Sequence, residues 1–307
     1  MKNIKKILLA VDGSDDKQTF VAEAATVAKD AGAEVTLLSV LDTPDGQKKS
    51  VESSDLKQWI MEDNLEQLKD ISSELAKSGI QVSIKQSSGK PYLKIIREAQ
   101  KGGFDLIMKP AENEPALKTI LFGGTDMQLF HLSPCPVWIF KPTFNTELRR
   151  IMIAVDLLAG DKEKSALANS VLKWGKYISS LVGSELHVVH TWHLFGETKM
   201  RGRTLNAKTV DRLVQDEERK HRQWLNEALE KIGLEQEKIQ IHFHKGDAKH
   251  LVPVIANDKN IDLLVMGTVG RTGIPGFFIG NTADSVLRQV GCSVLAIKPK
   301  GFSTPVK

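Results

Sequence analysis

The strongest constraint on the fold of this chain is an internal repeat at a constant offset of 157 residues. Asp105–Thr125 reads DLIMKPAENEPALKTILFGGT, and Asp262–Thr282 reads DLLVMGTVGRTGIPGFFIGNT. The same ungapped offset pairs further residues on both sides: Gly89 with Gly246, Cys135 with Cys292, and Lys141-Pro142 with Lys298-Pro299. Matches at one offset over so long a stretch indicate a duplication. We therefore expect two versions of one domain, called copy one and copy two below.

Length and composition agree with this organisation. The chain has 307 residues, which suits two domains of about 150 residues each. Hydrophobic residues make up 41% and charged residues 26%, as is usual for a soluble globular protein. The net charge is only +4, and no basic run interleaves with aromatic residues, so we expect no nucleic-acid partner. No stretch approaches 18 apolar residues, so we expect no membrane partner either.

Two cysteines, Cys135 and Cys292, occupy matched positions just before an apolar run in each copy. We expect both to be buried as free thiols, although a redox role stays open. So low a count suits the reducing cytoplasm. The first residues, MKNIKKILLAVDGS, have too short an apolar part for a signal peptide, so we predict a cytoplasmic protein.

Short apolar runs alternate with amphipathic segments along both copies, which is typical of βαβ units with a parallel sheet covered on both faces. We expect five strands and four helices in each copy. In copy one the strands are predicted at 4–11, 34–40, 80–86, 104–108 and 137–140, and the helices at 15–29, 55–77, 91–100 and 125–132. In copy two the strands are predicted at 150–155, 185–191, 238–244, 263–266 and 293–297, and the helices at 162–181, 207–231, 248–257 and 282–289. We expect loops at 43–54 and 192–206, a linker at about 141–148 and a disordered tail at 300–307.

Copy two contains a glycine-rich connection between a strand and a helix. The apolar run 263–266 stops at Gly267, Gly270 follows, and Gly280 precedes the helix that Asn281 and Thr282 open. Such a layout presents backbone N–H groups to a phosphate. Glycines at this spacing are also explained by a tight connection that needs positive φ angles.

Ligands of open parallel sheets bind beyond the carboxyl ends of the strands, where the strand order reverses. If the first and fourth strands of copy two are neighbours, Asp156 faces the glycine loop and can accept hydrogen bonds from a ribose or a base. A helix N-cap or a turn explains the aspartate equally well. In copy one, Pro110 and Asn113 replace Gly267 and Gly270, so copy one has lost the loop.

The pattern Gly267-x2-Gly270-x9-Gly280, followed by a small polar residue, resembles the nucleotide loop of the universal stress protein family. The segments AVDGS and AVDLL, which start at Ala10 and Ala154, resemble the family's first strand, and the final Lys-Pro fits as well. The resemblance covers nearly the whole chain and is greatest to the tandem E-type members, whose second loop reads GNTA. It implies two tandem doubly wound five-stranded parallel-sheet domains of the adenine nucleotide alpha hydrolase-like, Rossmann-like kind, at 1–142 and 149–299.

The resemblance also implies which residues bind a ligand. Nucleotide-binding family members hold ATP between the first and fourth strands. By position, Asp156 and Thr191 would flank the adenosine, and Met266 and Gly267 would line its other side. The phosphates would be held by Gly270, Gly280, Asn281 and Thr282. The family usually has Ser or Thr directly after the last glycine, whereas Asn281, which can still donate, stands here.

Copy one matches the adenosine positions with Asp12 and Val40. Pro110, however, lacks an N–H group, and Asn113-Glu114 adds bulk and negative charge near the phosphates. We therefore predict that copy one does not bind ATP in the same way.

Seven of the eight histidines lie in copy two. His242 and His244 share a strand face, and Asp247 and His250 follow, so a zinc site is conceivable. Histidines that are exposed or satisfied by hydrogen bonds explain the spacing better, and we predict no metal. The sequence has no Walker A loop, no GxGxxG and no GxSxG, and no nucleophile–base pair is supported by spacing.

We therefore expect a stress-response regulatory protein, not an enzyme, that binds ATP in copy two. In this family the apolar last strands, here 137–140 and 294–297, pair at their exposed edges, so we expect an intramolecular pseudo-dimer and possibly a homodimer of whole chains. A slow ATPase or nucleotidyl-transferring enzyme, and a carrier of another ligand, are the alternatives.

Overall fold

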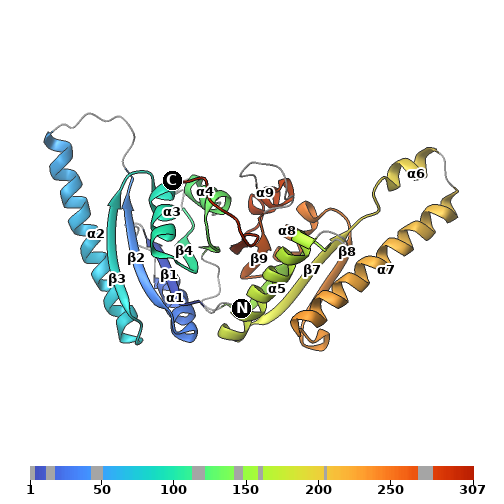
Figure 1. Cartoon of the computed structure of the whole chain (residues 1–307), viewed down its shortest axis with the longest axis horizontal. Coiled ribbons are helices and arrows are strands. Elements are labelled where there is room, and N and C mark those ends of the chain that lie inside the picture. The colour runs from blue at the N-terminus through green and yellow to red at the C-terminus, as the bar shows by residue number, and fades with distance from the viewer. Residues whose placement is uncertain are drawn as a thin grey trace.

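Figure 1 presents a computed structural model of the chain, with copy one on the left and copy two on the right. The structure describes residues 4–11, 18–42, 51–112, 122–141, 148–157, 162–203, 206–268 and 279–307. The glycine Gly270, and Asp12 and Asn113 of copy one, lie outside these ranges.

The described elements follow the repeated strand–helix order. In copy one they are β1 (Lys6–Val11), α1 (Gln18–Ala31), β2 (Glu34–Leu41), α2 (Val51–Lys77), β3 (Val82–Ser88), α3 (Pro91–Gly102), β4 (Leu106–Pro110), α4 (Gly124–Leu132) and β5 (Val137–Phe140). In copy two they are β6 (Arg150–Ala154), α5 (Lys162–Val182), β7 (Glu185–Trp192), α6 (Glu197–Arg203), α7 (Ala207–Ile232), the 3-10 turn η1 (Gln236–Lys238), β8 (Gln240–Lys245), α8 (Ala248–Asp258), β9 (Leu263–Gly267), α9 (Asn281–Leu287) and β10 (Ser293–Ile297).

All strands join one ten-stranded sheet in the order β3-β2-β1-β4-β5-β10-β9-β6-β7-β8. Neighbours within each copy are parallel, and the order reverses between the first and fourth strands of each copy. This confirms the predicted pair of doubly wound five-stranded domains. One core packs α1, α2, α5 and α7 against one sheet face, and a second core packs α3, α4, α8 and α9 against the other.

Residues that the repeat offset matches have the same structural role in both copies. The Asp105 carboxylate accepts backbone hydrogen bonds from Lys5 and Lys6 at 2.9 and 3.1 Å, at the start of β1. Asp262 accepts the equivalent bonds from Arg149 and Arg150, both at 2.9 Å, at the start of β6. In the turns after β3 and β8, the matched glycines adopt positive φ angles of 130° and 149°, at Gly89 and Gly246. These matches are those expected of a duplication.

The two copies join through their last strands, as predicted from the apolar edges. Strand β5 pairs antiparallel with β10, with Trp138 opposite Leu295. A lysine after each strand reaches the last helix of the other copy. Lys141 Nζ donates to Val290 O at 2.8 Å, after α9, and Lys298 Nζ donates to Phe130 O and, at 2.9 Å, to His131 O in α4. Because helix carbonyls at the C-terminus lack partners, both lysines satisfy acceptors across the interface.

Four predictions about local structure were wrong. The segment 192–206 contains helix α6, which has no apolar stripe and carries ion pairs: Arg201 contacts Glu197 at 3.0 Å and Asp211 at 2.8 Å. Copy two therefore has more helices than the expected four. Helix α2 begins at Val51, inside the predicted loop. Trp59 and Leu213, assigned to buried helix stripes, are 63% and 38% exposed.

The tail is also ordered against the fold, contrary to the prediction. Val306 is buried in the core that contains α3, and Arg97 Nε donates to Lys307 O at 2.6 Å. Packing across the copies, which the polar local sequence does not reveal, fixes this segment. Among the described residues, no helix is both long and apolar enough to cross a lipid bilayer.

Candidate functional site

The predicted ligand crevice lies where three strands of copy two end side by side. Ala154 of β6 is aligned with Val189 of β7 on one side and with Met266 of β9 on the other. The first and fourth strands of the copy are therefore neighbours, as the crevice hypothesis requires. Because parallel strands end at the same edge of a sheet, the carboxyl ends of β6 and β9 lie next to each other.

Two predicted residues share one side of the sheet, the face covered by α8 and α9. Met266 is 5% exposed and packs in that core together with Ala154 and Val189. Side chains alternate along a strand, so Thr191 of β7 points to the same face as Val189. Asp156 follows the end of β6. Thr191 is half-buried and Asp156 is exposed. The strand ends thus combine an apolar floor with a carboxylate at its open edge.

The two described glycines of the predicted loop, Gly267 and Gly280, differ in their structural surroundings. A Cβ atom on Gly267 would lie 2.9 Å from Leu167 Cδ2, so a larger residue there would have to displace the end of this flexible side chain of α5. Gly280 has φ −64° and ψ 142°, angles that any residue adopts, and it precedes α9 without a side-chain cap. Gly270 lies outside the described residues.

Gly280, the residue before α9, takes part in two backbone hydrogen bonds at the start of this helix. Gly280 N donates to Thr268 O at 2.9 Å, and Asp284 N donates to Gly280 O at 2.9 Å. The side chains of Asn281 and Thr282 are exposed. Within the described ranges, no bond is assigned to the N–H groups of these two residues. A helix N-terminus leaves such N–H groups without intrahelical partners, so they can receive an anion.

Thr268 is a site residue that the sequence analysis missed. Its side chain is fully buried, and its Oγ1 has no hydrogen-bond partner in the described part of the chain. A buried hydroxyl without a partner costs free energy, which a bound polar group can recover. A difference between the copies could have pointed to Thr268, because the matched residue of copy one, Ala111, has no hydroxyl.

Copy one fills the equivalent place with its own charged side chains. Lys109 Nζ and Asp126 Oδ1 form a buried ion pair at 2.9 Å, and Lys109 Nζ also donates to Pro110 O at 2.8 Å. The other Asp126 oxygen accepts from Gly123 N at 3.1 Å and from Glu112 N at 3.0 Å. Glu112 Oε2 accepts from Thr125 N at 3.4 Å, in the first turn of α4.

These carboxylates take the position that an anionic ligand would take. The repeat offset aligns Lys109 with Met266 and Asp126 with Ala283, so copy two is apolar where copy one is charged. Burial raises the pKa of Asp126 above its ordinary value, and the Lys109 ammonium opposes that rise. Of the expected obstacles in copy one, only Pro110 is described, and it pairs with Phe140 at the end of β4.

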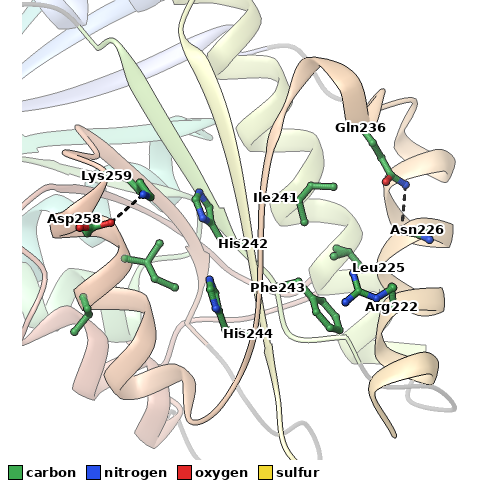
Figure 2. Close-up of a pocket in the computed structure, with 12 residues that line it drawn as sticks. Arg222, Leu225, Asn226, Gln236, Ile241, His242, Phe243, His244, Asp258 and Lys259 are labelled. Carbon is green, nitrogen blue, oxygen red and sulfur yellow. Dashed lines mark hydrogen bonds and ion pairs between the residues drawn. The ribbon is translucent and has the colours of Figure 1, made fainter. Parts of the chain in front are cut away.

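A separate pocket lies at the free edge of the sheet, along β8. Its volume is about 730 Å³, and none of the residues predicted to bind a ligand lines it. Figure 2 shows His242 and His244 pointing to the α8 side, where Asp258 and Lys259 lie, and Ile241 and Phe243 pointing to the α7 side. The residues predicted to bind a nucleotide therefore lie outside this pocket.

Hydrogen bonds account for two of the residues that suggested zinc, His242 and Asp247. His242 Nε2 lies 2.9 Å from His187 Nδ1, and Asp247 caps α8 by accepting from Lys249 N at 3.1 Å. In the part of the chain that the structure describes, no group of three or more His, Cys, Asp or Glu side chains is arranged to hold a metal ion.

Comparison with known proteins gives one consistent result. The model of the universal stress protein family matches residues 3–141 and 147–298. Universal stress protein E of Photorhabdus laumondii is 25% identical, with all of this chain and 99% of the relative covered, and that of Escherichia coli K12 is 25% identical, with 100% and 98% covered.

Solved structures agree. A functionally unknown protein from Pseudomonas aeruginosa PAO1 superposes with a TM-score of 0.72 and 25% identity over 96% of this chain and 93% of its own. A universal stress protein from Archaeoglobus fulgidus gives a TM-score of 0.67 and 21% identity over 95% and 98%, which supports the fold. With matches to the family model over both copies, this chain belongs to the universal stress protein family.

Proposed function

We propose that this protein is a stress-response regulator that binds one adenine nucleotide, ATP, in copy two and none in copy one. The observation that carries the proposal is the contrast between the two matched helix N-termini. In copy one the side chains of Asp126 and Glu112 accept from backbone N–H groups at the start of α4. Among the described residues, no side chain accepts from a backbone N–H group at the start of α9.

The remaining groups of the crevice fit the parts of a nucleotide. Met266 offers an apolar floor for a base, and Asp156 and Thr191 offer polar atoms to a ribose. The buried Thr268 hydroxyl supplies an additional donor or acceptor beside the anion-binding end. These groups bind and orient, and they include no pair arranged as nucleophile and base. We therefore propose binding without turnover, with the nucleotide acting as a signal in the cytoplasm.

Calorimetric titration of ATP tests the proposal in wild type and in Asn281→Glu. A glutamate in the first turn favours the helix dipole, so α9 should persist while the new carboxylate repels phosphate. We expect about one ATP per chain in wild type and at least roughly tenfold weaker binding in the variant. The matched control is Gly124→Glu in copy one, where a Cβ would meet open space. It should leave ATP binding unchanged.

Three results would contradict parts of this proposal. Failure of wild type to bind ATP would reject the nucleotide ligand. Equal loss of binding in Asn281→Glu and Gly124→Glu would reject copy two as the specific site. Release of inorganic phosphate from ATP by wild type, above the level seen with Asn281→Glu, would reject binding without turnover.

A homodimer of whole chains is a further part of the proposal. The two strands at the ends of the sheet, β3 and β8, pair on one side only. Edges of this kind are common places for association between chains. Sedimentation velocity at several protein concentrations tests this part, since a single monomeric species throughout would reject it.

A further inference from the structure

A pair of buried histidines lies directly behind the proposed adenosine position. His190 of β7 is 1% exposed, and His221 of α7 is 7% exposed. His190 Nδ1 lies 3.0 Å from Val155 O, and His190 Nε2 lies 2.8 Å from His221 Nδ1. Val155 immediately precedes Asp156. The hydrogen bonds from His221 through His190 therefore end at the backbone next to a residue of the proposed site.

The partners of the two rings fix their tautomers. A carbonyl oxygen only accepts, so His190 Nδ1 carries a proton and, in the neutral ring, Nε2 accepts. His221 Nδ1 must then donate, which leaves the neutral His221 without a proton on Nε2. That nitrogen lies 3.6 Å from Glu217 Oε1. When both rings are neutral, the lone pair of His221 Nε2 therefore faces the Glu217 carboxylate. One added proton on this nitrogen converts the contact into an ion pair.

The charged groups around the pair favour the added proton, and burial opposes it. Asp156, which follows β6, raises the pKa of both histidines, and Glu217 on α7 raises that of His221. His193, which follows β7, lowers the pKa of His221. Burial, the largest cause for both rings, holds their pKa values below the ordinary value. The aromatic rings of Trp192 and Trp224 contact His221, so little water is available to solvate a charge.

We propose that the His190–His221 pair takes up a proton when an adenine nucleotide binds beside Asp156, so that nucleotide affinity in copy two rises as the pH falls. The inference rests on the proposed nucleotide site. A bound nucleotide adds negative charge on the Asp156 side and excludes water there, which strengthens the attraction between Asp156 and a protonated ring. By linkage, a ligand that favours protonation is itself bound more tightly by the protonated protein.

Calorimetry with ATP at pH 7.5 and pH 6.0 tests the inference in wild type and in His221→Asn. An asparagine places an amide N–H near the position of Nδ1, which preserves the bond to His190 and removes the titrating ring. Affinity should rise on acidification about threefold more in wild type than in His221→Asn. Protonation of ATP itself contributes equally to both proteins and cancels in the comparison. Titration in buffers of different ionisation enthalpy should show greater proton uptake by wild type.

The second histidine pair of the copy provides a matched control. His242 also bonds to another histidine, and burial above all lowers its pKa to about 4, so it stays neutral over the tested range. His242→Asn should therefore reproduce the wild-type pH dependence. Identical pH dependence in wild type and His221→Asn would overturn the inference while the nucleotide site stands. Absence of ATP binding at both pH values would overturn the proposed function and this inference together.

A measurement without nucleotide checks the hydrogen-bonded pair itself. Nitrogen-15 NMR of the histidine rings should show the Nδ1–H tautomer for both His190 and His221 in the neutral state. Asp156→Asn should lower the pKa of His221 further, because an attractive charge is removed. A Nε2–H tautomer on His190, or a His221 pKa unchanged by Asp156→Asn, would contradict the proposed link between the pair and the crevice.

Discussion

The two copies carry the same strand–helix scaffold and differ most at the carboxyl end of their fourth strands. Copy one sets a buried lysine–aspartate pair where copy two has Met266 and Ala283. Its helix N-terminus is bonded to its own carboxylates, whereas no side chain among the described residues accepts from the backbone at the start of α9. The scaffold therefore tolerates a helix N-terminus with or without an internal anion. Stability of copy one should depend on its charges, while copy two leaves donors for a ligand.

The largest effect is expected from breaking the buried pair of copy one. Asp126→Ala leaves the Lys109 ammonium, in a side chain only 8% exposed, without its counterion. Loss of one partner from a buried ion pair costs about 3–5 kcal/mol of unfolding free energy. Urea unfolding followed by circular dichroism measures the loss.

The double variant Lys109→Met, Asp126→Ala, which installs the residues of copy two, is the control for this prediction. Because apolar replacement of both partners is often close to neutral, we expect it to recover more than half of the lost stability. A double variant as unstable as Asp126→Ala would mean that packing, and not the unpaired charge, sets the cost.

The reverse exchange should abolish the proposed function of copy two. Met266→Lys with Ala283→Asp transfers the charged pair into the crevice and fills it with a long side chain and a carboxylate. We expect ATP affinity to fall by about 100-fold, which corresponds to about 2.7 kcal/mol. Met266→Leu conserves volume and apolar character, so calorimetry should find its affinity close to that of wild type. Retained binding in the exchanged protein would place the ligand elsewhere.

Sequence reasoning recovered the fold because the determinants of the fold are local or repeated. Apolar runs bounded by turn residues predicted the strands, and the constant offset predicted the two copies. Helix α6 was missed because it has no apolar stripe, the pattern from which helices were predicted. The tail was missed because its contacts, such as Arg97 with Lys307, join residues far apart in sequence.

The candidate site was only partly predictable for a related reason. The neighbouring strands and the start of α9 followed from topology, which a pattern of strands and helices can suggest. The roles of Thr268 and of the pair Lys109–Asp126 could not be predicted, because burial and the geometry of interacting partners are not visible in one sequence. Gly267, which the family resemblance assigns to a ligand, also packs against Leu167, so the sequence pattern alone does not separate packing from binding at this glycine.

The matched interface lysines should make stability depend on pH to different extents. Burial lowers the pKa of Lys298 to about 7 and is the main cause that lowers the pKa of Lys141 to about 8. Both values lie below the unfolded value of about 10.4. Between the folded and unfolded pKa the unfolded chain binds more protons, so stability rises with pH from about 7 to 10.

Variants at the two lysines separate their contributions. Lys298→Met should remove the larger part of this rise and Lys141→Met the smaller part, because the pKa of Lys141 is lowered less. Urea midpoints measured from pH 6.5 to pH 10 provide the comparison. Identical pH slopes in wild type and Lys298→Met would show that Lys298 keeps an ordinary pKa in the folded protein.

The smallest effect is expected from removing the charge of Glu112 at the start of α4. Glu112→Gln keeps the size of the side chain and an oxygen acceptor for Thr125 N, but removes the charge that favours the helix dipole. We expect a loss of about 0.5–1 kcal/mol in unfolding free energy. ATP binding should still be confined to copy two, since the carboxylate of Asp126 continues to accept from Gly123 N. A second ATP per chain in Glu112→Gln would show that Glu112 alone keeps copy one closed, and that the loss of its glycines is secondary.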